Sequence, residues 1–326
     1  MKNQYYLGID GGGTGTRAIL ADAQGQVLAS ARAGSANRNH YTREQVRAAF
    51  QDVLRQALAP MPANGDLAGL FLGLSGVSTE ADKRDIQAIL RDIPEAARAA
   101  RVTVANDTVA ALTGGLSGRP GLALIAGTGS VCLGRNARGE QHLCGGWGAL
   151  ADDTGSAPWV GLRALQAVVR AEDGRLPPTL LQPIVFEFLG LAEPRRLISR
   201  VHNNGLERAE LGQLAPLVAD ACRQGDAAAA QILREAAAAL SEMAAVTSRR
   251  LFGDAACEMI LVGGLALSGP PFQPLLMEQI GRDSPAITIR APELSSVLGA
   301  VLEALRVGGI PWTQAVFDNL SAPNPL

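Results

Sequence analysis

The chain has 326 residues, of which 47% are hydrophobic and 18% are charged, and its formal net charge is -2. This length allows two globular domains, and the near-neutral charge excludes a protein that binds nucleic acid or an anionic membrane through bulk electrostatics. The Ala-rich stretch 227–239 is interrupted by Gln231, Arg234 and Glu235, so we predict no membrane-spanning helix.

The first residues, Met1 to Gln4, run directly into a strand-like segment, so we expect no signal peptide and a cytoplasmic location. The four cysteines form no C-x-x-C pair and the three histidines are dispersed, which argues against a structural zinc site. We expect buried, reduced thiols instead.

Strands and helices alternate along the first part of the chain after an opening meander. Strands are expected at 5–9, 16–21, 26–32, 67–73 and 101–104, and helices at 43–58, 79–91 and from 107. The segment Ser117–Gly121 is rich in turn residues and predicts a lobe boundary.

In the second part, strands are expected at 122–126, 130–135 and 258–262, and helices at 156–170, 179–189, 212–223, 226–251 and 294–306. Beyond Pro311 we expect little regular structure. The pattern predicts an α/β protein with two lobes, residues 1–117 and 118–326, each a mixed β-sheet with flanking helices. The helix at 294–306 is a candidate for packing back on the N-terminal lobe.

A short pattern occurs twice with the same spacing. Gly13-Thr14-Gly15-Thr16 matches Gly127-Thr128-Gly129-Ser130, and Asp22-Ala23-Gln24-Gly25 matches Asn136-Ala137-Arg138-Gly139 at the same offset. The shared spacing predicts an internal duplication, in which each lobe presents one Gly/Thr hairpin toward a cleft between the lobes.

The first hairpin, Asp10-Gly11-Gly12-Gly13-Thr14-Gly15-Thr16, has the composition of a phosphate-binding loop. Glycines let backbone N–H groups approach anionic oxygens, and Thr hydroxyls add donors. It is neither a Walker A loop nor a dinucleotide fingerprint, because no Gly-Lys-Ser/Thr follows and the next segment reads as a strand. The alternative is a glycine-rich hairpin without a ligand, which the second hairpin makes less attractive. Asp10 is then a candidate to hold Mg²⁺ through water.

Asn106-Asp107-Thr108 follows a predicted strand and opens a helix. The segment could act only as a helix N-cap, but Asp107 is also a candidate to accept the proton of an attacking hydroxyl.

Trp147 lies among the glycines of Cys144-Gly145-Gly146-Trp147-Gly148, and Asp153 follows in Asp152-Asp153-Thr154-Gly155-Ser156. This region predicts a sugar-contacting loop, and the alternative is a Trp in the core with Asp153 or Thr154 as an N-cap.

The chain also contains Gly8-Ile9-Asp10, Gly73-Leu74-Ser75-Gly76 and Val262-Gly263-Gly264. Together with the motifs above, and in their order along the chain, these segments resemble the N-acetylglucosamine kinase branch of the BadF/BadG/BcrA/BcrD ATPase family. That family belongs to the sugar kinase, heat-shock chaperone and actin superfamily, and the resemblance extends to about residue 305. It implies a two-lobe actin-like (ribonuclease H-like) fold, and ATP and Mg²⁺ as cofactors.

The resemblance also implies roles for individual residues. Asp107 corresponds to the catalytic base and Asp10 to the Mg²⁺ residue. The nucleotide would be bound by Asp10, Gly11, Gly12, Gly13, Thr14, Thr16, Gly127, Thr128, Gly129, Ser130, Gly263 and Gly264. The sugar would be bound by Asn37, Ser75, Asn106, Asp107, Thr128, Gly146, Trp147 and Asp153.

Two departures from the family pattern bear on function. Gly15 stands where similar loops carry Lys or Arg, with Arg17 as a candidate replacement, and Thr154 stands where Glu is usual. The first removes a cation near the phosphates, and the second leaves open whether the sugar carries an acetamido group or a free amine.

The sequence therefore predicts ATP-dependent phosphorylation of the 6-hydroxyl of N-acetylglucosamine, with glucosamine as an alternative acceptor. Two further alternatives are an ATPase that activates a 2-hydroxyacyl-CoA dehydratase and a sugar sensor without catalysis. The expected partner is a small amino sugar, not nucleic acid or a membrane, and a homodimer is expected from similar proteins.

Cys132 and Cys144 should lie opposite each other if the chain turns at 136–139, either as a redox-sensitive pair or as two small buried residues.

Overall fold

The computed structural model describes residues 3–13, 15–39, 41–202 and 205–322. It contains two compact units. The first comprises residues 1–121 together with 291–326, and the second comprises residues 122–290. The C-terminal segment therefore belongs to the same unit as the N-terminus, whereas the sequence-based division assigned it to the second lobe with the option of packing back. No helix of the described ranges is long and apolar enough to cross a membrane.

The first unit is built on a mixed sheet of five strands in the order β3-β2-β1-β4-β5. These strands are β1 (Gln4–Gly11), β2 (Thr16–Asp22), β3 (Val27–Ala33), β4 (Asp66–Leu74) and β5 (Val102–Asn106). The opening meander β1–β2–β3 is antiparallel, and β4 and β5 run parallel to β1. The carboxyl ends of β1, β4 and β5 therefore meet at one edge, where Asp10, Ser75 and Asn106 follow or end their strands.

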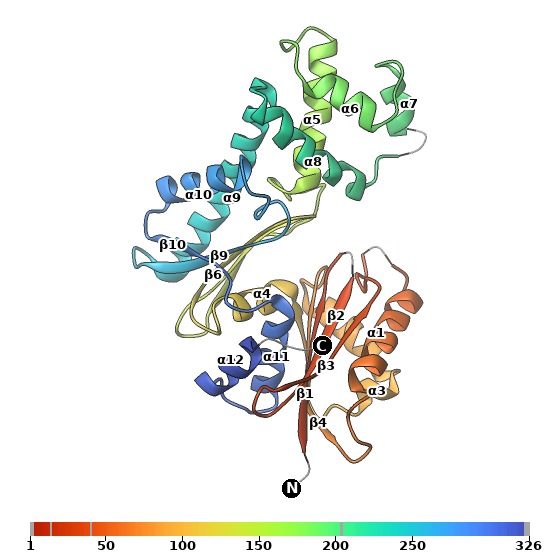
Figure 1. Ribbon diagram of the computed structural model, residues 1–326, viewed down its shortest axis with the longest axis vertical. Coiled ribbons are helices and arrows are strands. Elements are labelled where there is room, and N and C mark those ends of the chain that lie inside the picture. The colour runs from red at the N-terminus through yellow and green to blue at the C-terminus, as the bar shows by residue number, and fades with distance from the viewer. Residues whose placement is uncertain (1–2, 14, 40, 203–204, 323–326) are drawn as a thin grey trace. The chain divides into compact units, whose positions relative to one another are not determined.

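Helices cover both faces of this sheet (Figure 1). One face carries α1 (Arg43–Leu58), α2 (Glu80–Arg91) and α3 (Pro94–Ala97), and the other carries α4 (Asp107–Gly115), α11 (Ser296–Val307) and α12 (Gln314–Ser321). Alternate residues of β1 serve the two cores, because Leu7 and Ile9 pack under α1 whereas Tyr6 packs under α11.

The backbone of α11 comes very close to the sheet and to α4. A Cβ atom added at Gly8 of β1 would lie 2.3 Å from the backbone nitrogen of Val301, and one added at Gly299 would lie 2.0 Å from the carbonyl oxygen of Ala110. Only a residue without a side chain fits these positions, so glycines of β1 and α11 determine how closely α11 packs on the sheet and on α4.

The second unit has the same sheet plan, in the order β8-β7-β6-β9-β10. Its strands are β6 (Gly121–Ala126), β7 (Ser130–Arg135), β8 (Gln141–Gly145), β9 (Cys257–Val262) and β10 (Ile287–Arg290). By position in the strand order of the two sheets, β6 corresponds to β1, β7 to β2, β8 to β3, β9 to β4 and β10 to β5. Two mixed five-stranded sheets with flanking helices confirm the predicted fold class.

The predicted duplication is visible down to individual hydrogen bonds. In the turn after β2, Gly25 N–H donates to the Asp22 carbonyl at 3.1 Å, and the Asp22 carboxylate accepts from the backbone of Gln24 and Gln26 at 2.9 Å each. In the turn after β7, the Asn136 carbonyl and side chain accept the equivalent bonds from Gly139, Arg138 and Glu140 at 3.0 Å each. Gly25 and Gly139 share a φ of +81°, a value that favours glycine.

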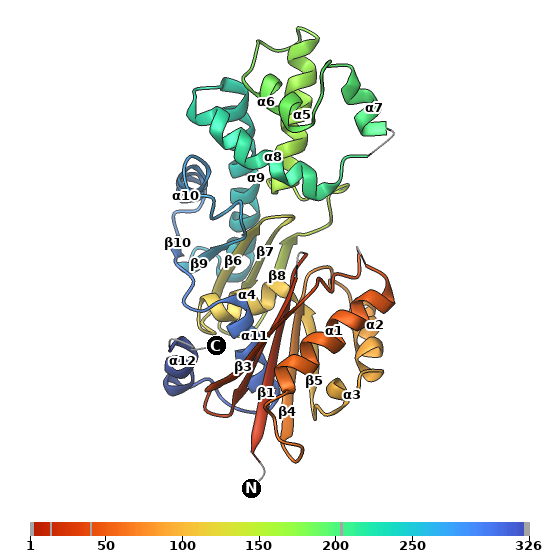
Figure 2. The same ribbon diagram turned by 45° about the vertical axis from the view of Figure 1, so that its right-hand side comes forward.

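The helices of the second unit fall into two groups (Figure 2). The long helix α9 (Ala227–Phe252) lies along β7 and β8 with α10 (Phe272–Asp283) beside it. Beyond one end of the sheet are α5 (Ala157–Glu172), α6 (Leu181–Phe188), α7 (Arg196–His202) and α8 (Arg208–Arg223), of which α5 packs closely on α8. Four described elements of the second unit, α7, α10, β8 and β10, lie outside the ranges expected from the sequence.

The expectation of an irregular tail beyond Pro311 is wrong. Thr313 caps α12 by accepting a hydrogen bond from the backbone of Val316, and Val316 and Leu320 are buried in the core under α11. Asn319 also donates to the carbonyl of Gln24 at 2.7 Å. A short helix with two apolar residues on one face is stabilised mainly by tertiary packing, which a local pattern does not reveal.

Candidate active site

Asp10 lies at the carboxyl end of β1, directly before the first Gly/Thr turn. The residue is 8% exposed, and its Oδ2 accepts a hydrogen bond of 2.8 Å from Arg17. Burial raises the pKa of Asp10, and the Arg17 guanidinium opposes that shift only in part. Within the turn, Gly12 N–H donates to the Gly15 carbonyl at 2.9 Å; Thr14 lies outside the described residues.

Asp107 is the first residue of α4, and Asn106 is its N-cap. The Asn106 side chain accepts a hydrogen bond of 3.0 Å from Thr108 N–H and donates one of 3.0 Å to the Val77 carbonyl. Capping is therefore performed by Asn106, which leaves the Asp107 carboxylate available for another role.

The pKa of Asp107 is raised to about 7, first by burial and second by the negative charge of Asp10. The two carboxylates are thus close enough to interact, because β1 and β5 run in the same direction and end at the same edge of the sheet. A carboxyl group that titrates near neutral pH is suited to accept a proton from a substrate hydroxyl.

The loop that carries Asn37 is bound to the first Gly/Thr turn and to the end of β4. Asn37 Nδ2 donates to Ser75 Oγ at 3.0 Å, and Ser35 Oγ donates to the Gly12 carbonyl at 3.0 Å. Thr16 Oγ1 donates to the Gly34 carbonyl at 2.9 Å, and Ser75 N–H donates to the Gly11 carbonyl at 2.8 Å. Asn37 and Ser75, both predicted sugar residues, are therefore paired, and their loops are attached to the Asp10 turn.

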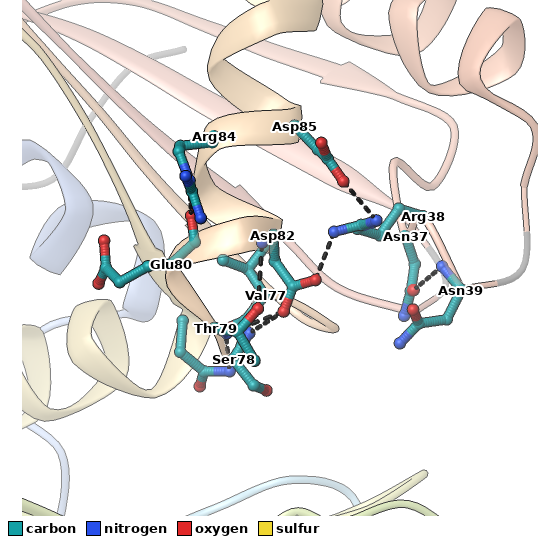
Figure 3. Close-up of polar contacts among 11 residues, drawn as sticks. Asn37, Arg38, Asn39, Val77, Ser78, Thr79, Glu80, Asp82, Arg84 and Asp85 are labelled. Atoms are coloured by element: carbon teal, nitrogen blue, oxygen red, sulfur yellow. Dashed lines mark hydrogen bonds and ion pairs between the residues drawn. The ribbon is translucent and has the colours of Figure 1, made fainter.

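Arg38, which the sequence analysis did not single out, anchors the same loop from its other side. Its guanidinium lies between Asp82 and Asp85 of α2, at 2.8 Å from Asp85 and in direct contact with Asp82 (Figure 3). The Asp82 carboxylate also accepts from the backbone N–H groups of Ser78 and Thr79 at 3.0 and 2.8 Å. The Asn37 loop is thereby tied to the beginning of α2, which itself is held by a capping box.

In the second unit, the predicted nucleotide residues also lie together. Gly127 N–H donates to the Gly129 carbonyl at 2.9 Å, and the Ala126 carbonyl accepts from both Leu265 and Ala266 at 3.1 Å. Gly263 has a φ of +98°, and a Cβ atom there would lie 2.4 Å from the Ala126 carbonyl oxygen. The Gly263–Gly264 turn therefore lies directly against the second Gly/Thr hairpin, and Gly263 requires the absence of a side chain.

Asp153 joins the predicted sugar loop to this hairpin. It is buried and has a φ of +56°, and its Oδ1 accepts from Ser130 N–H at 3.2 Å. Gly146 N–H donates to the Ser130 carbonyl at 3.0 Å, so Ser130 contacts both ends of the loop. Ser156, and not Asp153 or Thr154, caps α5, which removes the capping interpretation of Asp153.

Trp147 is 80% exposed, so it is not a core residue as the alternative interpretation required. An exposed aromatic ring between glycines is a free surface on which the apolar face of a sugar could pack. The structure thus excludes both alternatives for this loop, a Trp in the core and an N-cap by Asp153 or Thr154.

Cys132 and Cys144 are register partners in the β7–β8 pair, as predicted, and all four cysteines are free thiols. Burial raises the pKa of Cys132 to about 12 and also raises the pKa of Cys144. Both thiols stay protonated near neutral pH, which favours two small packed residues over a reactive pair.

The described residues include no group of three or more His, Cys, Asp or Glu side chains that could hold a metal ion. Asp10 nevertheless fits the way proteins hold Mg²⁺ with a nucleotide, which needs one or two carboxylates and retained waters. Arg17 engages Oδ2 only, and no described residue donates to Oδ1. Arg17, the candidate replacement for a cation at Gly15, is thus paired with Asp10.

The structure brings the predicted residues into two sets, one in each unit. The first set contains Asp10, Asn37, Ser75, Asn106 and Asp107, and the second contains Gly127–Ser130, Gly146, Asp153, Gly263 and Gly264. Sequence reasoning missed Ser35, Arg38 and Arg208, the last of which pairs with Asp153. No local pattern marks these residues, because each partner is at least 23 positions away.

Comparison with known proteins shows the family of the chain. The model of the BadF/BadG/BcrA/BcrD ATPase family matches residues 7–304. An N-acetylmuramic acid/N-acetylglucosamine kinase of Clostridium acetobutylicum is 32% identical over 235 residues, which are 72% of this chain and 76% of that protein. An N-acetyl-D-glucosamine kinase of Dictyostelium discoideum is 29% identical over 317 residues, 94% of this chain and 99% of that protein.

A solved structure from Chromobacterium violaceum, provisionally assigned as an N-acetylglucosamine kinase, superposes with a TM-score of 0.72 at 28% identity. The superposition covers 91% of this chain and 98% of that one. The likeness to solved and curated relatives thus extends over both units.

Proposed function

Because the chain belongs to the BadF/BadG/BcrA/BcrD ATPase family, we propose that it is a kinase that transfers the γ-phosphoryl group of ATP to the 6-hydroxyl of N-acetylglucosamine. The observation that carries this proposal is the pair Asp10–Asp107, in which a half-buried carboxyl with a pKa of about 7 interacts with a second, buried carboxylate. A general base and a magnesium-binding carboxylate are the two acidic groups that such a reaction needs.

In this proposal Asp107 orients the acceptor hydroxyl and removes its proton as the hydroxyl oxygen attacks the γ-phosphorus. The bond between the γ-phosphorus and the β,γ-bridging oxygen breaks, and ADP leaves. The Gly/Thr hairpins Gly11–Thr16 and Gly127–Ser130 would bind phosphate oxygens through their backbone N–H groups. Asp10 would hold Mg²⁺ through water, and the ion would neutralise charge on the phosphates. Gly263 and Gly264 border the adenosine.

Sugar recognition is assigned to Asn37, Ser75, Trp147 and Asp153. Asn37 and Ser75 offer an amide and a hydroxyl that already bond to each other, and Asp153 and the exposed ring of Trp147 supply a carboxylate and an apolar surface. Thr154 replaces the Glu usual in similar loops, so glucosamine remains the second acceptor to test.

The test is a coupled assay of ATP turnover with N-acetylglucosamine, glucosamine, N-acetylmannosamine and glucose, followed by ³¹P-coupled NMR of the product. We expect the highest kcat/KM with N-acetylglucosamine and phosphate on the 6-oxygen. Turnover that no sugar stimulates would refute the kinase assignment, and tight sugar binding without product would favour the sensor. A brown, iron-containing protein would favour the dehydratase activator.

The homodimer and the cytoplasmic location stay predictions.

The activity should depend on pH through Asp107. Since a base must be unprotonated, kcat/KM should fall about tenfold per pH unit below the pKa of about 7 and level off above it. The measurement is a pH profile from about 5.5 to 8.5 with coupling enzymes in excess at every pH. A profile that stays flat between about 5.5 and 7 would exclude Asp107 as the titrating base.

Replacing Arg38 should weaken sugar binding specifically. In Arg38→Ala the Asn37 loop loses its connection to α2, and we expect the sugar KM to rise about tenfold, or about 1.4 kcal/mol, with kcat and the nucleotide KM changed less than about threefold. Arg55→Ala, which removes an exposed pair with Asp52 at 3.2 Å in the same unit, is the matched control and should behave as wild type. An unchanged sugar KM in Arg38→Ala would show that the loop keeps its position without this anchor.

A further inference from the structure

We propose that Arg208 is a positioning residue that couples the second Gly/Thr hairpin to the Asp153 loop, so that nucleotide and sugar affinity depend on one guanidinium. The proposal rests on the assignment of these two loops to phosphate and sugar binding. Arg208 is the first residue of α8, in the helical part of the second unit, and lies far in sequence from both loops.

Two contacts carry the inference. The same nitrogen, Nη2 of Arg208, forms an ion pair with Oδ2 of Asp153 and donates a hydrogen bond to the carbonyl oxygen of Thr128. Asp153 receives Ser130 N–H on its other oxygen, so both carboxylate oxygens are fixed and the two loops are bridged twice. A Cβ atom at Gly129 would lie 3.3 Å from this nitrogen, so Arg208 lies directly over the hairpin.

The position of Arg208 does not benefit the helix that carries it. A cation in the first turn of a helix opposes the helix dipole, and α8 has no side-chain cap at this end. Its Nε is also buried without a hydrogen-bond partner among the described residues. The guanidinium therefore opposes the helix dipole and has an unpaired buried N–H. Its contacts with Asp153 and Thr128 offset these two costs.

The contacts also explain why a guanidinium is needed. Asp153 holds a left-handed backbone conformation that a non-glycine residue rarely adopts, and its carboxylate is buried. A buried carboxylate needs a partner of opposite charge in fixed geometry, and the planar guanidinium supplies it better than the flexible ammonium of lysine. Without Arg208 we expect Asp153 to leave its position and Thr128 to lose its restraint.

The experiment compares Arg208→Ala, Arg208→Lys and the control Arg175→Ala, which removes an exposed pair with Asp173 at 2.6 Å in the same unit. For Arg208→Ala we expect a sugar KM about tenfold higher and a nucleotide KM about threefold higher, with a smaller change in kcat. Arg208→Lys should be intermediate and Arg175→Ala as wild type. A general loss of folded protein would lower the maximal rate but leave both KM values unchanged, so the pattern separates positioning from stability.

A second comparison tests the coupling directly. In the Asp153→Asn background, Arg208→Ala should raise the sugar KM less than about twofold further, because its partner is already altered, while the nucleotide KM should still rise about threefold through Thr128. Fully additive effects on the sugar KM would overturn the inference.

Hydrogen exchange of the protein without ligands gives a readout that does not depend on activity. We expect faster exchange at residues 127–130 and 146–155 in Arg208→Ala and unchanged exchange there in Arg175→Ala. Unchanged exchange in Arg208→Ala would overturn the proposal whatever the kinetics. If the wild-type protein phosphorylates no sugar, the proposed function fails, and the exchange data alone decide whether Arg208 bridges the loops.

Discussion

Asp107→Asn is expected to lower kcat by about 10²- to 10⁴-fold, the usual contribution of a positioned general base. Asn has nearly the same shape and cannot accept the proton of the sugar hydroxyl, so binding of sugar and nucleotide should change by less than about threefold. The measurements are steady-state kinetics and calorimetric titration with each ligand. Activity above about one tenth of wild type would show that Asp107 is not the base.

Folding is expected to be intact in Asp107→Asn, and this separates the chemical from the structural effect. The pKa of Asp107 is higher in the folded chain than the 3.8 of an unperturbed Asp, so the fold loses stability as pH rises between those values and stays weakened above about 7. The neutral Asn avoids this cost, and its melting temperature at pH 8 should equal or exceed wild type. Glu44→Gln, an exposed acid in the first turn of α1, is the matched control and should change neither property.

Gly299→Ala is expected to destabilise the first unit by about 1–3 kcal/mol. In an isolated helix this change would help, since Ala is favoured over Gly by about 1 kcal/mol. Here the new Cβ would lie 2.0 Å from the Ala110 carbonyl oxygen and 2.5 Å from Gly114 N, so α11 has to move away from α4. The measurement is the midpoint of urea unfolding.

Gly281→Ala in α10 is the matched control for this prediction. Its Cβ would have no neighbour within 4 Å, so the same substitution should be neutral or stabilising by up to about 1 kcal/mol. Equal effects at the two positions would show that the α4–α11 contact is not as close as the structure has it.

Local chemistry made part of this molecule predictable. The turns Asp22–Gly25 and Asn136–Gly139 contain the side-chain acceptor and the glycine that their backbone requires, so a repeated spacing was enough to reveal the repeated sheet. Asp10 and Asp107 could each be singled out because each lies at the carboxyl end of a predicted strand. The predicted roles of these residues in binding and catalysis await the experiments above.

What the sequence missed depends on contacts between distant segments. β10 is a four-residue edge strand that is defined by its pairing with β9, and α12 is defined by the core beneath it. Arg38 and Arg208 look like ordinary surface cations in the sequence, and only the folded chain brings them to Asp82 and Asp153. Charge alone does not indicate which of many acids an arginine will find.

The return of α11 to the first unit has a consequence for how the polypeptide is made. On the ribosome, residues 1–121 emerge long before residues 296–307, so the sheet face that carries Tyr6 and Phe71 has α4 but lacks the cover of α11 and α12 while the whole second unit is synthesised. The second unit is one uninterrupted stretch and can complete its core first. A nascent chain halted before residue 296 would expose an apolar surface to chaperones and to other chains.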